Sequence, residues 1–160
     1  MPPAPRPTFM YEDTVSGPVC GLDEVGRGPL AGPVVAACVV IPDSVRTHPF
    51  VSDLQDSKKL TKVKLKILNG LIHQHCHVAI AEHSPAEIDD MNILQASLSA
   101  MRMALDQMRD INIAYALVDG NRMPQDLSCP GQALVGGDGL SKSIAAASIV
   151  AKFYRDELMV

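Results

Sequence analysis

The first half of the chain alternates short apolar runs with breaks rich in glycine and proline. Residues 19–25 and 34–41 are small or β-branched, and the GRGPLAGP segment between them is typical of a turn or a bent connection. We therefore expect two paired strands here. Residues 77–84 have the same short apolar character and predict a third strand.

Helical spacing of apolar positions characterises several other segments. Residues 58–76 and 92–110 have their apolar positions at largely helical spacing. In the second segment Met101 and Met108 belong to the core-facing stripe. The sequence Ser84-Pro85-Ala86-Glu87 is typical of a helix start. Residues 141–159 predict a last helix, capped by Ser141 or Ser143, whose alanines allow close approach to a sheet.

Two further apolar runs, residues 113–120 and 132–138, predict strands that end on Asp119 and Asp138. The order of elements is then strand, strand, helix, strand, helix, strand, strand, helix. This order predicts an α/β fold with a mixed five-stranded sheet flanked by helices. A chain of 160 residues with 47% hydrophobic residues can bury the core of one such domain.

The proline-rich start of the chain does not fit this pattern. We expect residues 1–17 to form a flexible leader and residues 18–160 to form the domain. The leader lacks the continuous apolar region of an export signal, and the longest uncharged apolar stretch, residues 29–42, is too short for a bilayer. The sequence therefore predicts a cytoplasmic protein with no membrane contact.

Four carboxylates lie at or near the ends of predicted strands and within three positions of a glycine: Asp23, Glu24, Asp119 and Asp138. Strand ends converge at one edge of an α/β sheet, so these side chains can form one cluster. Such a cluster favours hard divalent cations, Mg²⁺ or Mn²⁺, and two such ions would support hydrolysis of a phosphodiester. Asp119 and Asp138, each taken singly, also fit an ordinary turn residue.

The net charge and the distribution of lysines give opposite indications about binding to nucleic acid. The net charge of -4 is unusual for a nucleic-acid binder, because phosphate contacts normally supply much of the affinity. Five lysines nevertheless lie close together in the sequence: Lys58, Lys59, Lys62, Lys64 and Lys66. They indicate either a phosphate-binding surface or a solvated helix face.

Several long motifs resemble those of the ribonuclease HII family, the type 2 ribonucleases H. They are GLDEVGRGPLAGPVVAACV, DSKKLT, NILQASLSAM, VDGN and GGDGLSKSIAAASIVAKFYRD, and they occur in the family's order over nearly the whole chain. The resemblance implies a ribonuclease H-like fold. It also implies a metal-dependent endonuclease that cuts the RNA strand of RNA–DNA hybrids and single ribonucleotides embedded in duplex DNA, leaving 3′-hydroxyl and 5′-phosphate ends.

By position in these motifs, the resemblance assigns metal binding and catalysis to Asp23, Glu24, Asp119 and Asp138. It assigns substrate binding to Gly26, Arg27 and Gly28, whose backbone would approach the ribose 2′-hydroxyl, and to Lys58 and Lys59, which would contact phosphates. The related ribonuclease HIII family usually has Gly-Lys-Gly at this loop, so Arg27 favours ribonuclease HII. A monomer is expected, with hybrid nucleic acid as its partner.

Two features depart from the family pattern. Gly136 stands before Gly137 where the family often has lysine, which removes one possible phosphate contact. Family members also continue into a Lys-Gly-Tyr-Gly segment whose tyrosine stacks on the sugar at the RNA–DNA junction, and we expect the domain to lack that segment because the sequence ends at Val160. The alternative function is therefore a hybrid-binding module with weak or no cleavage.

Overall fold

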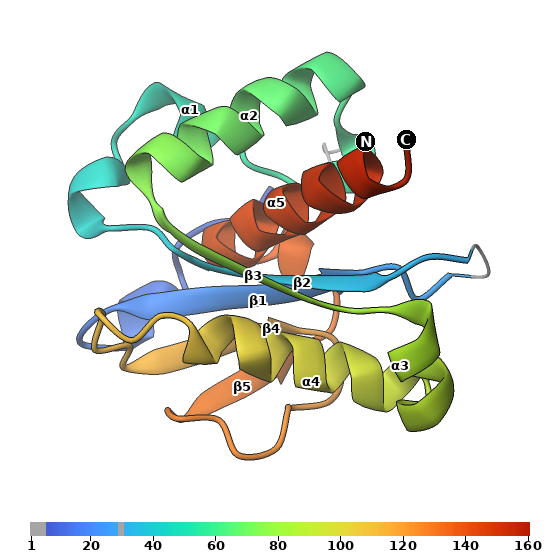
Figure 1. The fold of residues 1–160 in the computed structure, drawn as a ribbon. Coiled ribbons are helices and arrows are strands. Elements are labelled where there is room, and N and C mark those ends of the chain that lie inside the picture. The colour runs from blue at the N-terminus through green and yellow to red at the C-terminus, as the bar shows by residue number, and fades with distance from the viewer. Residues whose placement is uncertain (1–5, 29–30) are drawn as a thin grey trace.

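The computed structural model describes residues 6–28 and 31–160, and its centre is one mixed sheet (Figure 1). The order in the sheet is β3-β2-β1-β4-β5. β1 pairs antiparallel with β2, which pairs antiparallel with β3, while β4 lies parallel to both β1 and β5. The strands are β1 (Val19–Val25), β2 (Val34–Val40), β3 (His77–His83), β4 (Tyr115–Asp119) and β5 (Gly131–Leu134). The predicted mixed five-stranded sheet is confirmed.

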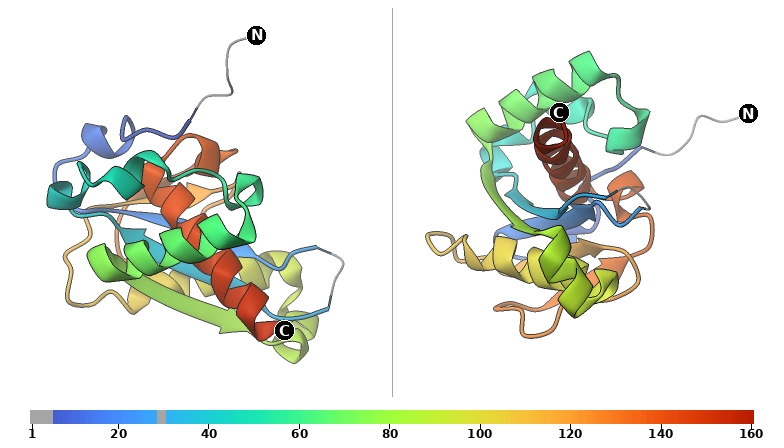
Figure 2. Two further views of the ribbon diagram at one scale, coloured as in Figure 1. Left: turned by 90° about the horizontal axis from the view of Figure 1, so that it is seen from above. Right: turned by 45° about the vertical axis from the view of Figure 1, so that its right-hand side comes forward.

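Helices cover both faces of this sheet. The helices are α1 (Pro49–Ser52), α2 (Lys62–His75), α3 (Pro85–Met91), α4 (Ile93–Asp106) and α5 (Lys142–Leu158). α4 packs on one face and α5 on the other, and α2 lies across the outer side of α5 (Figure 2). The short helix α1 was not predicted. None of the described helices is long and apolar enough to cross a membrane.

Two predicted helix starts are present with their capping hydrogen bonds. Ser84 and Glu87 form a reciprocal capping box at the start of α3. Ser141, one of the two candidates, caps α5 by accepting a hydrogen bond from the amide of Ile144 at 3.2 Å. Both caps satisfy amides that a helix leaves without partners in its first turn, which is why the sequence signal is strong.

The core has two main parts, one on each face of the sheet, because side chains of a strand alternate between the faces. Cys20 and Leu22 of β1 pack with α4, whereas the apolar side chains of α5 pack with β2 and α2. Gly21 lies on the α5 side, where an added Cβ would come within 2.2 Å of the backbone carbonyl carbon of Ser143. The backbone of α5 therefore touches β1 two residues before Asp23.

The N-terminal segment differs from the expected flexible leader. Residues 1–5 lie outside the described residues, but residues 6–17 pack against the domain. Thr8 forms an isolated parallel bridge with Ser141, its amide donates to the Leu140 carbonyl at 3.1 Å, and its carbonyl accepts from the Lys142 amide at 3.0 Å. Glu12 is buried in a 3₁₀ turn, Glu12–Thr14. Backbone pairing to a distant helix start, which leaves no local pattern in the sequence, holds this segment in place.

Candidate functional site

Three of the four expected carboxylates meet at one edge of the sheet. Asp23, Glu24 and Asp119 each offer a carboxylate oxygen, and these oxygens lie within 4.8 Å of one another. Asp23 and Glu24 belong to β1, and Asp119 is the last residue of the neighbouring parallel strand β4. Among the described residues this is the only group of at least three metal-ligating side chains so close together.

Burial and neighbouring acidic charges destabilise the ionised forms of Asp23 and Glu24. Asp23 is only 5% exposed, and its pKa is raised well above the usual value by desolvation and by the charges of Asp119 and Glu24. Its Oδ1 accepts a hydrogen bond from the Glu24 amide at 2.8 Å. Desolvation also raises the pKa of Glu24, and the Arg27 guanidinium, 3.6 Å from Glu24 Oε1, partly opposes this shift.

Asp138 lies beside the group but does not end a strand, so its expected placement was wrong. β5 stops at Leu134, and Asp138 occupies a 3₁₀ turn, Gly137–Gly139, that leads into α5. The Asp138 amide donates to Asp119 Oδ1 at 3.3 Å. Desolvation and the charge of Asp119 raise the pKa of Asp138 to about 6. Asp138 is therefore electrostatically part of the site, although it is not one of the three carboxylates within 4.8 Å.

Glycines make this turn possible. Gly136 has a φ of 66°, a left-handed conformation that side chains disfavour. At Gly137 an added Cβ would come within 2.6 Å of Ile144 Cδ1 and 3.3 Å of Asp119 Oδ1. The two glycines therefore allow the chain to turn tightly against the site before α5 begins.

Asp56 is a fifth acidic residue near the site that the sequence reasoning missed. Its charge contributes to the raised pKa of Asp138, which the charge of Lys58 opposes. The Asp56 side chain accepts from the Lys58 amide at 3.0 Å, and the next residue, Ser57, accepts a hydrogen bond from Ser148 of α5 at 2.7 Å between hydroxyl oxygens. The DSKK sequence places one carboxylate two residues before a pair of lysines, and this was the available signal.

The Gly26-Arg27-Gly28 loop follows β1 beside the carboxylates. Gly26 has a φ of 106°, and an added Cβ would lie 2.4 Å from the Pro33 carbonyl oxygen, so this glycine is required by the fold. No described atom would lie within 4 Å of a Cβ at Gly28. Arg27 and Gly28 are exposed, as are Lys58 and Lys59. The loop therefore presents a cation and open backbone next to the acidic group.

The donor set fits a hard divalent cation. Its ligands are carboxylate oxygens on rigid strands. A nearby cation, Arg27, pairs with Glu24 from an exposed position. A buried carboxylate whose pKa is raised by its acidic neighbours gains more from a cation than an isolated surface carboxylate does. Carboxylate oxygens are ligands that suit hard divalent cations.

Comparisons with known proteins agree with this geometry. Residues 20–160 match the sequence profile of the ribonuclease HII family. Ribonuclease HII of Paramagnetospirillum magneticum is 50% identical over 153 residues, which cover 96% of this chain and 75% of that protein. Ribonuclease HII of Rhodospirillum rubrum is 53% identical over 156 residues, or 96% of this chain and 70% of that protein. Across eight curated relatives, the chain spans from 58% to 75% of their lengths.

Solved structures show the same fold. The ribonuclease H2 of Pyrococcus horikoshii superposes with a TM-score of 0.75 at 26% identity, over 89% of this chain and 74% of that one. The Bst ribonuclease HIII in complex with Mn²⁺ superposes with a TM-score of 0.72 at 19% identity, over 89% of this chain and 53% of that one, and supports the fold alone. With its profile match, its identity to these relatives and its acidic group, the chain belongs to the ribonuclease HII family of endonucleases acting on RNA–DNA hybrids.

Proposed function

We propose that Asp23, Glu24, Asp119 and Asp138 hold catalytic Mg²⁺ or Mn²⁺, and that the chain cuts both RNA–DNA hybrids and single ribonucleotides embedded in duplex DNA. The products would carry 3′-hydroxyl and 5′-phosphate ends. The observation that carries this proposal is the approach of three carboxylates to within 4.8 Å at one sheet edge. Such crowding of like charges is unfavourable unless a cation balances it.

Each side chain has a distinct part in this proposal. Asp23 and Asp119 are fixed by adjacent central strands and would provide the rigid ligands. Glu24 is held against Arg27, and Asp138 reaches the site from a turn. When bound, the metal ions supply a nucleophilic water at neutral pH and stabilise negative charge on the leaving oxygen. The protein orients the scissile phosphate and keeps the carboxylates in place.

Recognition of the ribose would come from the exposed part of the glycine loop. The 2′-hydroxyl distinguishes RNA from DNA, and a backbone group can reach it only where no side chain stands in the way. Gly28 meets that condition, whereas Gly26 is already required for the conformation of the loop. A Gly28→Ala variant therefore tests close approach by the substrate, and a Gly26→Ala variant mainly tests folding.

A cleavage assay tests the proposed function directly. The substrate is a labelled DNA duplex with one ribonucleotide, and the control is the same duplex made only of DNA. We expect metal-dependent cleavage at the ribonucleotide alone, with no cleavage after chelation by EDTA. Binding of the ribonucleotide duplex without detectable cleavage would instead favour the hybrid-binding module.

Replacing Arg27 with Ala should weaken hybrid binding and flatten its dependence on salt. One phosphate contact fewer lowers the slope of log K against log salt by about 0.9 in magnitude. Binding titrations at several salt concentrations measure this slope. Arg109→Ala is the matched control. Arg109 is exposed and lies before the start of β4, whereas Asp119 lies at the end of that strand. Equal slopes for the two variants would rule out a phosphate contact by Arg27.

A further inference from the structure

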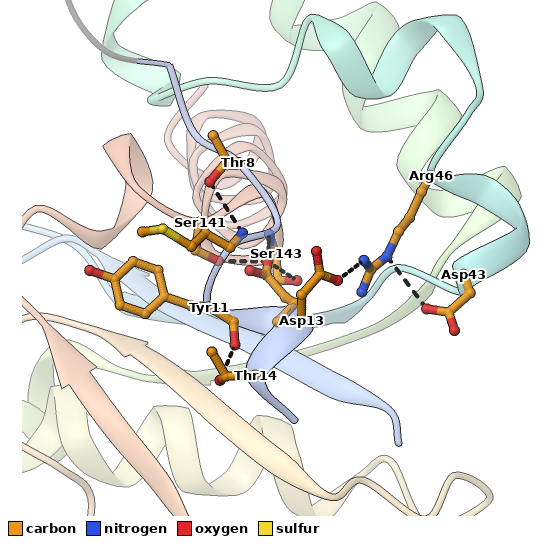
Figure 3. Close-up of polar contacts among 10 residues, drawn as sticks. Thr8, Tyr11, Asp13, Thr14, Asp43, Arg46, Ser141 and Ser143 are labelled. Atoms are coloured by element: carbon orange, nitrogen blue, oxygen red, sulfur yellow. Dashed lines mark hydrogen bonds and ion pairs between the residues drawn. The ribbon is translucent and has the colours of Figure 1, made fainter. Parts of the chain in front are cut away.

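A buried carboxylate outside the acidic group is bound to the start of α5. Glu12 is 2% exposed, and its Oε2 accepts hydrogen bonds from the Ser141 hydroxyl at 2.9 Å, the Ser143 amide at 3.0 Å and the Ser143 hydroxyl at 2.8 Å. Figure 3 shows Ser141 and Ser143 next to the N-terminal segment that carries Thr8 and Tyr11. Three donors from one helix start thus converge on one carboxylate oxygen.

This arrangement makes Glu12 and the first turn of α5 dependent on each other. A buried carboxylate is strongly unfavourable without hydrogen-bond donors, and a helix start has free amides and a positive partial charge. Charge-assisted hydrogen bonds are also stronger than neutral ones. The position of α5 along its axis is therefore restrained by a residue far away in the sequence.

The restrained turn is continuous with Asp138. The Leu140 and Ser141 amides both donate to the Gly137 carbonyl, at 2.9 and 2.8 Å, which closes the turn that carries Asp138. Thr8 pairs with the backbone of Leu140 and Lys142 on the other side. A shift of the helix start would therefore move Asp138 relative to Asp119, whose Oδ1 it contacts through its amide.

We propose that Glu12 is a positioning residue for the reaction: it fixes the first turn of α5 and thereby the carboxylate of Asp138. This inference rests on the proposed function, because it takes Asp138 to be a metal ligand. Glu12 lies before residues 20–160, the part of the chain that matches the family profile. Glu12 is thus part of the catalytic unit and does more than cover the fold.

The test compares Glu12→Gln with Asp13→Asn. Both remove one carboxylate charge from the same segment, but Asp13 is exposed and pairs with Arg46 instead of α5 (Figure 3). For Glu12→Gln we expect kcat, measured at saturating metal and hybrid, to fall about tenfold. We expect the affinity for Mn²⁺ to fall severalfold. Effects of this kind follow the loss of residues that hold metal ligands in place. The KM for hybrid should stay within about twofold. Asp13→Asn should match the parent in all three values.

Ser143→Ala separates positioning from a simple effect of charge. It keeps the Glu12 charge and removes one of the three donors. We expect Ser143→Ala, like Glu12→Gln, to lower kcat and Mn²⁺ affinity. In the variant that carries both substitutions, the free-energy change should be smaller than the sum of the changes in the two single variants. If Glu12→Gln does not fold, Ser143→Ala is compared with the parent in its place.

Hydrogen exchange distinguishes failure of this inference from failure of the proposed function. Amides of residues 138–144 should exchange faster in Glu12→Gln than in Asp13→Asn, whether or not the protein cleaves a substrate. A parent that neither binds Mn²⁺ in calorimetry nor cleaves hybrid would refute the proposed function. Unchanged exchange, kcat and Mn²⁺ affinity in folded Glu12→Gln would refute the role of Glu12.

Discussion

Replacing Asp119 with Asn is expected to lower the cleavage rate by at least about a hundredfold while the fold stays intact. Asn has the same size but lacks the charge that would hold a metal ion between β1 and β4. Loss of this charge also relieves repulsion on Asp23, whose pKa Asp119 helps to raise. The melting temperature of the metal-free variant should therefore equal or exceed that of the parent.

Asp110→Asn provides the control for this experiment. Asp110 is exposed in the turn after α4, so the same chemical change there should affect neither the rate nor the melting temperature. Rates are measured at saturating Mn²⁺ with the duplex that carries one ribonucleotide. Parental activity in Asp119→Asn would remove Asp119 from the proposed site, and a large fall in melting temperature would show that Asp119 is structural.

Replacing Gly21 with Ala is expected to destabilise the protein by about 3 kcal/mol, at the upper end of overpacking effects. The new Cβ would lie 2.2 Å from backbone atoms of Ser143, and no rotation of a side chain can relieve a contact with backbone. β1 is the central strand of the sheet, so α5 would have to move away from it. Urea denaturation of the metal-free protein gives the free energy of unfolding for this comparison.

Gly70→Ala is the matched control, since Gly70 is an exposed residue in the interior of α2 with no neighbouring atom within 4 Å of an added Cβ. Alanine favours helix over glycine by up to about 1 kcal/mol, so this variant should be slightly more stable than the parent. A Gly21→Ala variant with parental stability would mean that α5 does not pack on β1 as closely as described.

The sheet and most of its helices could be predicted because their signals are local. The alternation of apolar and small residues in β1 and β2 follows from a strand with a helix on each face. The Ser84 capping box lies within four consecutive residues, and the required donors belong to the same turn. Asp119 follows an apolar strand directly, so its place at the sheet edge could also be inferred.

The surroundings of Asp138 could not be predicted in the same way. Residues 132–138 have the composition of a strand, but the left-handed Gly136 and the tightly packed Gly137 end the strand earlier and form a turn. The space at Gly137 is too small for a Cβ because Ile144 and Asp119 lie beside it, and this arrangement exists only after the sheet and α5 have come together. The same holds for Asp56, which reaches the site through a loop anchored on Ser148.

The burial of Glu12 could not be predicted from the periodicity of the sequence. One acidic residue in a proline-rich segment has no repeating pattern, and its partners are at the other end of the sequence. Burial of such a residue depends on hydrogen bonds between distant segments. Composition alone therefore predicts a flexible leader over residues 1–17, and this prediction does not hold for residues 6–17.

The topology of the sheet also determines when the acidic group forms during folding. β1, β2 and β3 are sequential and antiparallel, so they can pair early, whereas β4 must find β1 across most of the chain. We therefore expect Asp23 and Asp119 to meet only when β4 joins β1, and their repulsion to oppose that step. A metal ion that binds the completed site should then slow unfolding of the native protein more than it speeds the early stages of folding.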